Sequence, residues 1–107
     1  MSEFVDFLQE QFELFGRINS KRMFGGHGLF YDGLMIGLVA DDTLYLKVDK
    51  QSKAQFEQSG LAPFRYNKNG KWMTMSYHQA PPEALDDPEV MREWANLAFE
   101  AARRSKK

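Results

Sequence analysis

The sequence lacks cysteine, long apolar runs and any large charge excess, and each absence excludes a class of protein. Its 107 residues include no Cys, so neither a disulfide framework nor a thiolate zinc site can form. No stretch approaches the roughly 18 consecutive apolar residues of a membrane span. The acidic start Met1–Asp6 lacks the basic segment of a secretory signal. We therefore expect a cytoplasmic protein with no membrane partner.

Charge is nearly balanced overall but unevenly distributed. The formal net charge is −1, so no overall basic field points to nucleic acid. Residues 1–16 carry four acids and no base, whereas residues 17–71 carry nine bases and five acids. The basic middle of the chain is either an ordinary solvated sheet surface or part of a contact surface.

Hydrophobic residues make up 43% of the chain, with nine Phe, four Tyr and two Trp, which is enough for one core. We expect a single domain over residues 1–107. The sequence shows no internal repeat at the periods of solenoid proteins and no low-complexity segment.

Helical periodicity occurs at both ends of the chain and once in between. A first helix is predicted from Glu3 to Phe15, with Ser2 as N-cap and Gly16 as stop. Its apolar face consists of Phe4, Phe7, Leu8, Phe12 and Phe15. A short helix over about 51–59 follows Asp49 as its cap, with Ala54 and Phe56 directed inward. The last helix begins at Asp87-Pro88 and carries Val90, Met91, Trp94, Leu97, Ala98, Ala101 and Ala102 on its apolar face.

Between the helices the pattern is that of β-strands joined by tight turns. We predict a four-strand meander over residues 20–24, 29–31, 34–40 and 43–48, and two more strands over 64–68 and 71–78. Asp32-Gly33 and Asn69-Gly70 are typical of two-residue type I′ hairpins. The predicted order is α-ββββ-α-ββ-α, an α+β fold with two layers in which helices cover one face of an antiparallel sheet.

The residues that resemble a ligand site have simpler structural interpretations. Gly25-Gly26-His27-Gly28 lacks the ending of a phosphate-binding Walker loop and leads into a strand rather than a helix. We interpret these glycines as backbone geometry or as places where another segment approaches closely. His27 and His78 have no metal-ligand spacing, and His78 is expected at the polar rim of a strand end.

No catalytic group stands out. Ser76 and His78 share one side of a strand, but no nucleophile elbow or oxyanion loop surrounds Ser76. We therefore expect no catalytic residue, no metal, no cofactor and no enzyme activity.

A contact surface is expected on the side of the sheet that the helices leave free. Leu44, Leu46 and Val48 are predicted to face the helices, which directs Tyr45 and Lys47 the other way. If Met73, Met75 and Tyr77 also point inward, Trp72 and Thr74 point outward. The candidate contact residues for a partner or DNA are Lys21, Arg22, Tyr45, Lys47, Arg65 and Trp72. Such a mixture of basic and aromatic groups suits a dimer interface or a nucleic-acid surface, and isolated exposed aromatics are the plain alternative.

Several motifs in fixed order resemble one protein family. The block Lys21–Gly33 (KRMFGGHGLFYDG), followed by Leu44–Asp49 (LYLKVD), resembles the N-terminal domain of the TfoX/Sxy family. The remaining matches are Pro63–Tyr66, Gly70-Lys71, Met75–Tyr77, Asp86–Pro88 and Trp94-Ala95. The resemblance runs from about Phe4 to Ala102 and concerns this domain alone, whereas larger family members carry a second, C-terminal domain.

The resemblance implies a helix-sheet fold and a bacterial regulator of competence for DNA uptake. Such a regulator acts as a transcriptional coactivator, so the expected partners are a transcription factor of the cyclic-AMP receptor protein type, DNA, or both. The alternative is a homodimeric or adaptor interaction domain of another pathway with no direct DNA contact.

Overall fold

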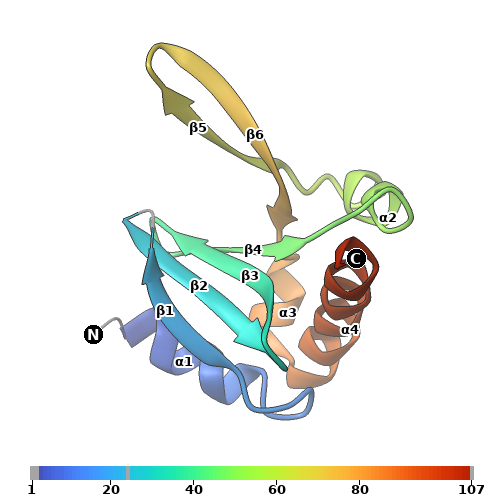
Figure 1. Cartoon of the computed structure of the whole chain (residues 1–107). Helices are drawn as coiled ribbons and strands as arrows, with labels where there is room; N and C mark the ends of the chain where they lie inside the picture. The colour runs from blue at the N-terminus through green and yellow to red at the C-terminus, as the bar shows by residue number, and fades with distance from the viewer. Residues whose placement is uncertain (1–2, 24, 107) are drawn as a thin grey trace.

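The computed structural model describes residues 3–23 and 25–106 and shows a six-stranded antiparallel sheet with four helices (Figure 1). The helices are α1 (Glu3–Gln11), α2 (Lys53–Gln58), α3 (Pro82–Asp86) and α4 (Pro88–Ser105). The strands are β1 (Asn19–Met23), β2 (Gly26–Tyr31), β3 (Leu34–Ala40), β4 (Thr43–Lys47), β5 (Pro63–Lys68) and β6 (Lys71–Gln79).

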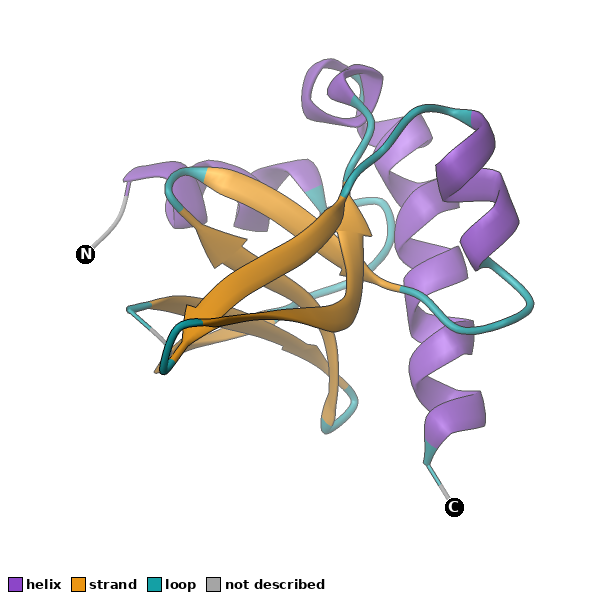
Figure 2. Ribbon diagram, turned by 90° about the horizontal axis from the view of Figure 1, so that it is seen from above, coloured by secondary structure: helices purple, strands orange, loops and turns teal. Residues whose placement is uncertain are grey.

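The strand order in the sheet is β1-β2-β3-β4-β6-β5, with every neighbouring pair antiparallel. Strands β1 to β4 form the predicted meander. After α2 the strands do not follow in sequence order, since β6 pairs with β4 and β5 lies at the edge of the sheet. Helices α1, α3 and α4 lie on one side of the sheet, as the two perpendicular views show (Figures 1 and 2). The predicted two-layer α+β fold is confirmed.

The predicted turns are formed by residues in the left-handed region of backbone conformation. Asp32 and Gly33 have φ angles of 52° and 79°, and Asn69 and Gly70 have 53° and 83°. Two consecutive positive φ angles define a type I′ turn, whose twist matches that of the flanking strands. The Asn67 side chain accepts a hydrogen bond of 3.1 Å from the Gly70 amide, which stabilises the β5–β6 turn.

The core lies between the sheet and the helices. Leu44, Leu46 and Val48 point into it, as the alternation in β4 predicts. Helix α4 packs against β3 and β4 and contributes small side chains, including Ala95 and Ala98, which allow its backbone to lie close to the sheet.

The N-terminal helix is shorter than predicted. It ends at Gln11, and Phe12 to Phe15 form the turn that follows it. Phe7, predicted to be inward, is exposed, while the buried Gln11 donates a 2.9 Å hydrogen bond from Nε2 to the carbonyl oxygen of Ala84. The predicted N-cap Ser2 and the predicted strand residue Phe24 lie outside the described residues.

Helix α3 was not predicted because five residues are too few to show a helical period. It occupies the segment between β6 and α4, and the Asp87 carboxylate caps α4 as predicted by accepting a hydrogen bond of 2.9 Å from the Glu89 amide. No helix within the described ranges is long and apolar enough to cross a membrane.

Helix α2 begins two residues later than predicted. The Asp49 carboxylate accepts hydrogen bonds of 3.0 Å from the amides of Gln51 and Ser52, so it stabilises the turn that precedes the helix. Phe56 is buried as predicted, but Ala54 is exposed.

Candidate binding surface

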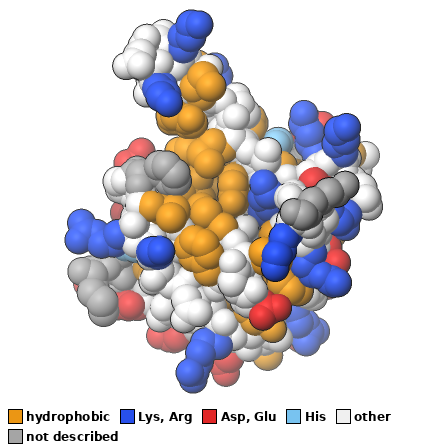
Figure 3. Space-filling view, viewed as in Figure 1, with side chains coloured by type: hydrophobic (Ala, Val, Ile, Leu, Met, Phe, Trp, Pro, Cys, Tyr) orange, Lys and Arg blue, Asp and Glu red, His pale blue; other side chains and the backbone are white. Residues whose placement is uncertain are grey.

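The side of the sheet opposite the helices is uncovered, and hydrophobic side chains gather across its centre (Figure 3). Residues paired across antiparallel strands point to the same side, so the register identifies this surface. One row across five strands consists of Lys21, Gly28, Leu38, Tyr45 and Gln79. We call this side the open face. On β1 to β4 and the base of the β5–β6 hairpin its larger side chains are Lys21, Met23, Phe30, Met35, Leu38, Tyr45, Lys47, Phe64 and Tyr77. Leu38 and Tyr77 are themselves buried beneath their neighbours. Tyr66, Lys68, Lys71, Met73 and Met75 continue the same side onto the outer hairpin.

Gly28 forms the floor of the apolar area over β1 to β3. A Cβ atom at this position would lie 2.8 Å from Met23 Sδ, 3.1 Å from Phe30 Cε1 and 3.2 Å from Met35 Cε. These three flexible or aromatic side chains therefore close over the glycine. The glycine has a packing role here, in agreement with the predicted close approach and against a phosphate loop.

Aromatic rings continue the apolar area from the centre of the sheet onto β5. The rings of Tyr45 and Phe64 lie edge to face with centroids 5.0 Å apart, and Phe64 stacks on Tyr66 at 6.1 Å. Such edge and stacked arrangements favour aromatic pairs beyond the area that they bury.

Lys47 and Tyr77 add polar groups to the open face without adding an acid. The Lys47 ammonium lies 5.2 Å from the centre of the Tyr77 ring. Burial raises the pKa of Tyr77 to about 12, so its hydroxyl stays protonated and able to donate a hydrogen bond at neutral pH. The open face thus combines apolar area with positive charge.

The expected orientation of β6 was wrong. Tyr77 pairs with Lys47 and shares the open face with it, while His78 pairs with Leu46 and points to the helix side. Met73 pairs with Tyr66 and is exposed. The alternation misled because the outer part of β6 has no helix layer on either side, so large apolar residues there do not mark an interior.

His78 is buried, which corrects its predicted place at a polar rim. Its Nδ1 lies 2.8 Å from the Leu61 carbonyl oxygen, and because a carbonyl only accepts, Nδ1 carries the proton. The Phe56 ring packs beside it, with centroids 5.8 Å apart. His78 therefore joins α2 and the start of β5 to the sheet.

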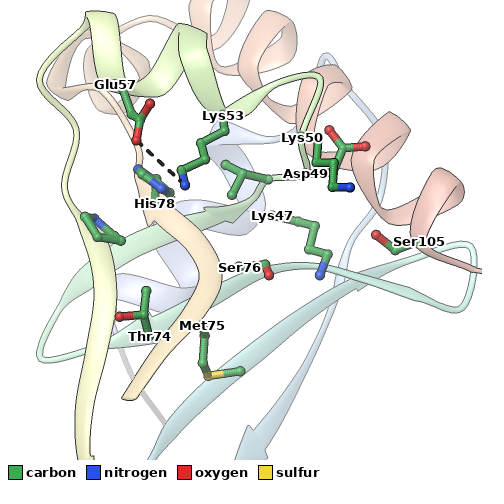
Figure 4. A pocket seen from close by; sticks show the side chains of 12 residues that line it. Lys47, Asp49, Lys50, Lys53, Glu57, Thr74, Met75, Ser76, His78 and Ser105 are labelled. Carbon is green, nitrogen blue, oxygen red and sulfur yellow. Dashed lines mark ion pairs between the residues drawn. The ribbon is translucent and has the colours of Figure 1, made fainter. Parts of the chain in front are cut away.

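A pocket of about 460 Å³ opens where β6, α2 and the end of α4 meet (Figure 4). Among its lining residues are Lys47, Lys50, Lys53, Glu57, Ser76 and Ser105. Lys53 lies 3.9 Å from Glu57, which neutralises part of the positive charge. Within residues 3–23 and 25–106, no three His, Cys, Asp or Glu side chains are placed to hold a metal ion.

The ion pair between Asp49 and Arg104 connects the end of β4 to the end of α4. Arg104 donates from Nε and from Nη2, the latter over 3.0 Å to Asp49 Oδ1. Hydrogen bonding from Arg104 holds the pKa of Asp49 well below its usual range, and the same bond raises the pKa of Arg104. Both pKa shifts result from the ion pair that attaches the last turn of α4 to the sheet.

The six predicted contact residues do not form one patch. Lys21, Tyr45 and Lys47 lie on the open face. Arg22 pairs with His27 on the opposite side of β1, at one edge of the sheet. Arg65 and Trp72 lie together on the β5–β6 hairpin near the other edge, with the guanidinium 5.4 Å from the centre of the Trp72 ring. Five of the six predicted residues therefore lie on two separate surfaces and do not form one basic patch.

Comparison with known proteins identifies the family. Residues 10–102 match the model of the TfoX N-terminal domain. The chain belongs to the TfoX N-terminal domain family. It is 38% identical over 74 residues to the DNA transformation protein TfoX1 of Aliivibrio fischeri, a match that covers 65% of this chain and 35% of that protein. The chain thus matches about a third of the length of this TfoX relative.

Sequence reasoning missed several open-face residues of this TfoX domain. Phe30, Met35 and Phe64 are partly exposed there but were not among the candidates, because an apolar residue in a strand is normally assigned to the core. Gly28 could have indicated this surface, since a glycine within a strand often marks close packing on one side of the sheet.

Proposed function

We propose that this TfoX-family domain is a regulatory binding module of competence for DNA uptake, and not an enzyme. It acts as a transcriptional coactivator that contacts a transcription factor of the cyclic-AMP receptor protein type, DNA, or both. The family match and the relative named a DNA transformation protein support this proposal. The structure supports it through one observation, the uncovered sheet face.

The chemistry of the open face favours a protein partner for this surface. Its strands present partly exposed Met, Phe and Tyr side chains together with Lys21 and Lys47, and no acid. Extended apolar area on a small domain commonly marks an interaction site. The two lysines fit a partner surface that is apolar at its centre and carries Asp or Glu at its rim.

The proposal is tested by calorimetric titration with a purified transcription factor of this type in the presence of cyclic AMP. We expect the double charge reversal K21E/K47E to weaken binding at least about tenfold, because like charges then face each other across the interface. The matched control R17E/R92E changes the net charge equally but lies off the open face. Equal losses for the two variants would refute the open face as the binding site, and no binding by the unmodified chain would refute this partner.

A homodimer is the second candidate for the same surface, because an apolar face that binds a partner is also able to bind its own copy. Analytical ultracentrifugation over a wide concentration range separates the two candidates. A strict monomer removes the homodimer, whereas a dimer that K21E/K47E dissociates would place a second copy on the open face.

A further inference from the structure

The β5–β6 hairpin extends beyond the rest of the molecule (Figures 1 and 3). Only its base is part of the main sheet, through the pairing of Tyr77–Gln79 with β4. Its outer half keeps large side chains in solvent, with Trp72 63% exposed, Met73 42% and Tyr66 36%. Side chains of this size that stay largely in solvent bury little apolar area for the fold.

The charge of the hairpin differs from that of the chain as a whole. Pro63–Gln79 contains Arg65, Lys68 and Lys71 and no acid, although the whole chain has a net charge of −1. The bases occupy both sides of the ribbon. Lys68 and Lys71 pair with each other on the side of Tyr66, whereas Arg65 lies with Trp72 on the other side.

Positive charge on both sides of a ribbon fits a groove between two phosphate backbones better than a flat surface. Strands are about 4.8 Å apart and a sheet with its side chains is about 10 Å thick, whereas the major groove of DNA is about 12 Å wide. A two-stranded ribbon therefore enters this groove with its two sides toward the two phosphate walls.

The hairpin is preorganised for such a contact. Its type I′ turn and the Asn67 hydrogen bond fix the tip, and the Arg65 guanidinium lies over the Trp72 ring, 5.4 Å from its centre. A guanidinium held over an aromatic ring by a cation–π contact still has N–H groups with which to bind phosphate oxygens.

We propose that the β5–β6 hairpin is a duplex-DNA-binding arm that lies in the major groove. Arg65, Lys68 and Lys71 contact phosphates, and Trp72 contacts bases or sugars. The inference rests on the proposed regulatory function, because it assigns the DNA contact of that function to one element and leaves the open face to the protein partner.

The salt dependence of DNA affinity tests the three phosphate contacts. In a fluorescence anisotropy titration of the whole chain against a 20-base-pair duplex, three contacts predict an affinity about fortyfold lower at 200 mM than at 50 mM salt. For K68Q/K71Q, one remaining contact predicts a drop of only about three- to fourfold. The control R17Q/R92Q has the same net charge as K68Q/K71Q, but it should keep the salt dependence of the unmodified chain.

Fluorescence of Trp72 gives a second and independent measurement. Trp94, the other tryptophan, is packed against Phe56 in the core with ring centroids 4.8 Å apart. In a W94F chain, the emission of Trp72 alone is observed, and DNA should quench it as the ring moves from water to a stacked position. Circular dichroism checks that each variant is folded.

Two results would overturn the hairpin assignment. One is a salt dependence in K68Q/K71Q equal to that of the unmodified chain, together with unchanged Trp72 emission, which would place the DNA contact elsewhere. The other is no DNA affinity at 50 mM salt. If the transcription factor still binds in that case, the proposed function remains through its protein contact, and the hairpin assignment alone fails.

Discussion

The two sides of the sheet use the same strands for different purposes. On the covered side, Leu44 and Leu46 of β4 and the following Val48 are buried against helices, so their side chains must fit the surrounding core. On the open side, Tyr45 and Lys47 of the same strand remain partly exposed and no helix constrains them. We infer that substitutions on the covered side change stability, whereas those on the open side and the hairpin change binding.

The largest effect is expected on the covered side. Phe56→Ala should lower the free energy of unfolding by about 3–5 kcal/mol, because it leaves a cavity beside Trp94 and His78. Urea denaturation followed by circular dichroism measures this loss. The matched change Tyr66→Ala on the hairpin should cost far less, and comparable losses would remove the distinction between the two regions.

A smaller effect is expected at the turn that joins β2 to β3. Gly33→Val should cost about 1–2 kcal/mol, since a β-branched residue resists a φ angle of +79° although nothing lies within 4 Å of the added Cβ. The exposed control Lys53→Ala should stay within about 0.5 kcal/mol. If Gly33→Val leaves the free energy of unfolding unchanged in the same denaturation experiment, Gly33 does not need a positive φ angle in this turn.

The Asp49–Arg104 ion pair should give a pH-dependent effect at the boundary of the helix layer. Because hydrogen bonding from Arg104 lowers the folded-state pKa of Asp49 below its ordinary value of about 3.8, the pair stabilises the fold above about pH 4. That contribution disappears as the pH falls toward the folded-state pKa. Asp49→Asn should therefore be less stable than the unmodified chain at pH 7, and the difference in melting temperature should shrink below pH 4. A difference that does not change with pH would contradict this linkage.

The smallest effect on stability is expected at the most exposed aromatic residue. Trp72→Ser should change the free energy of unfolding by no more than about 0.5 kcal/mol, because the ring is 63% exposed. The same variant should lose DNA affinity in the anisotropy assay. A large loss of stability with unchanged DNA affinity would reverse the roles of the two regions.

Local signals in the sequence were sufficient for most of the fold. Asp32-Gly33 and Asn69-Gly70 predicted the β2–β3 and β5–β6 turns, because Asp-Gly and Asn-Gly readily adopt two positive φ angles in succession. The alternation in β4 also predicted which side the helices cover. The pairing of β6 with β4 could not be predicted, because it depends on the path of the chain through α2.

The candidate surface could be predicted only in part. Tyr45, Lys47 and Trp72 were selected as outward residues, and the structure exposes each of them at least partly. Their separation onto the open face and the hairpin was not visible in the sequence. On the hairpin, Trp72 and Met73 are both exposed although they point to opposite sides, so no alternation marks a buried side there.

Methionine methyl signals in an NMR titration with the transcription factor show whether the open face binds this partner. Met23, Met35, Met73 and Met75 lie on the open face, and Met91 is buried in the helix-covered core and serves as an internal control. We predict that the signals of Met23 and Met35 shift on binding while that of Met91 stays in place. A shift of the Met91 signal with those of Met23 and Met35 unchanged would contradict binding at the open face.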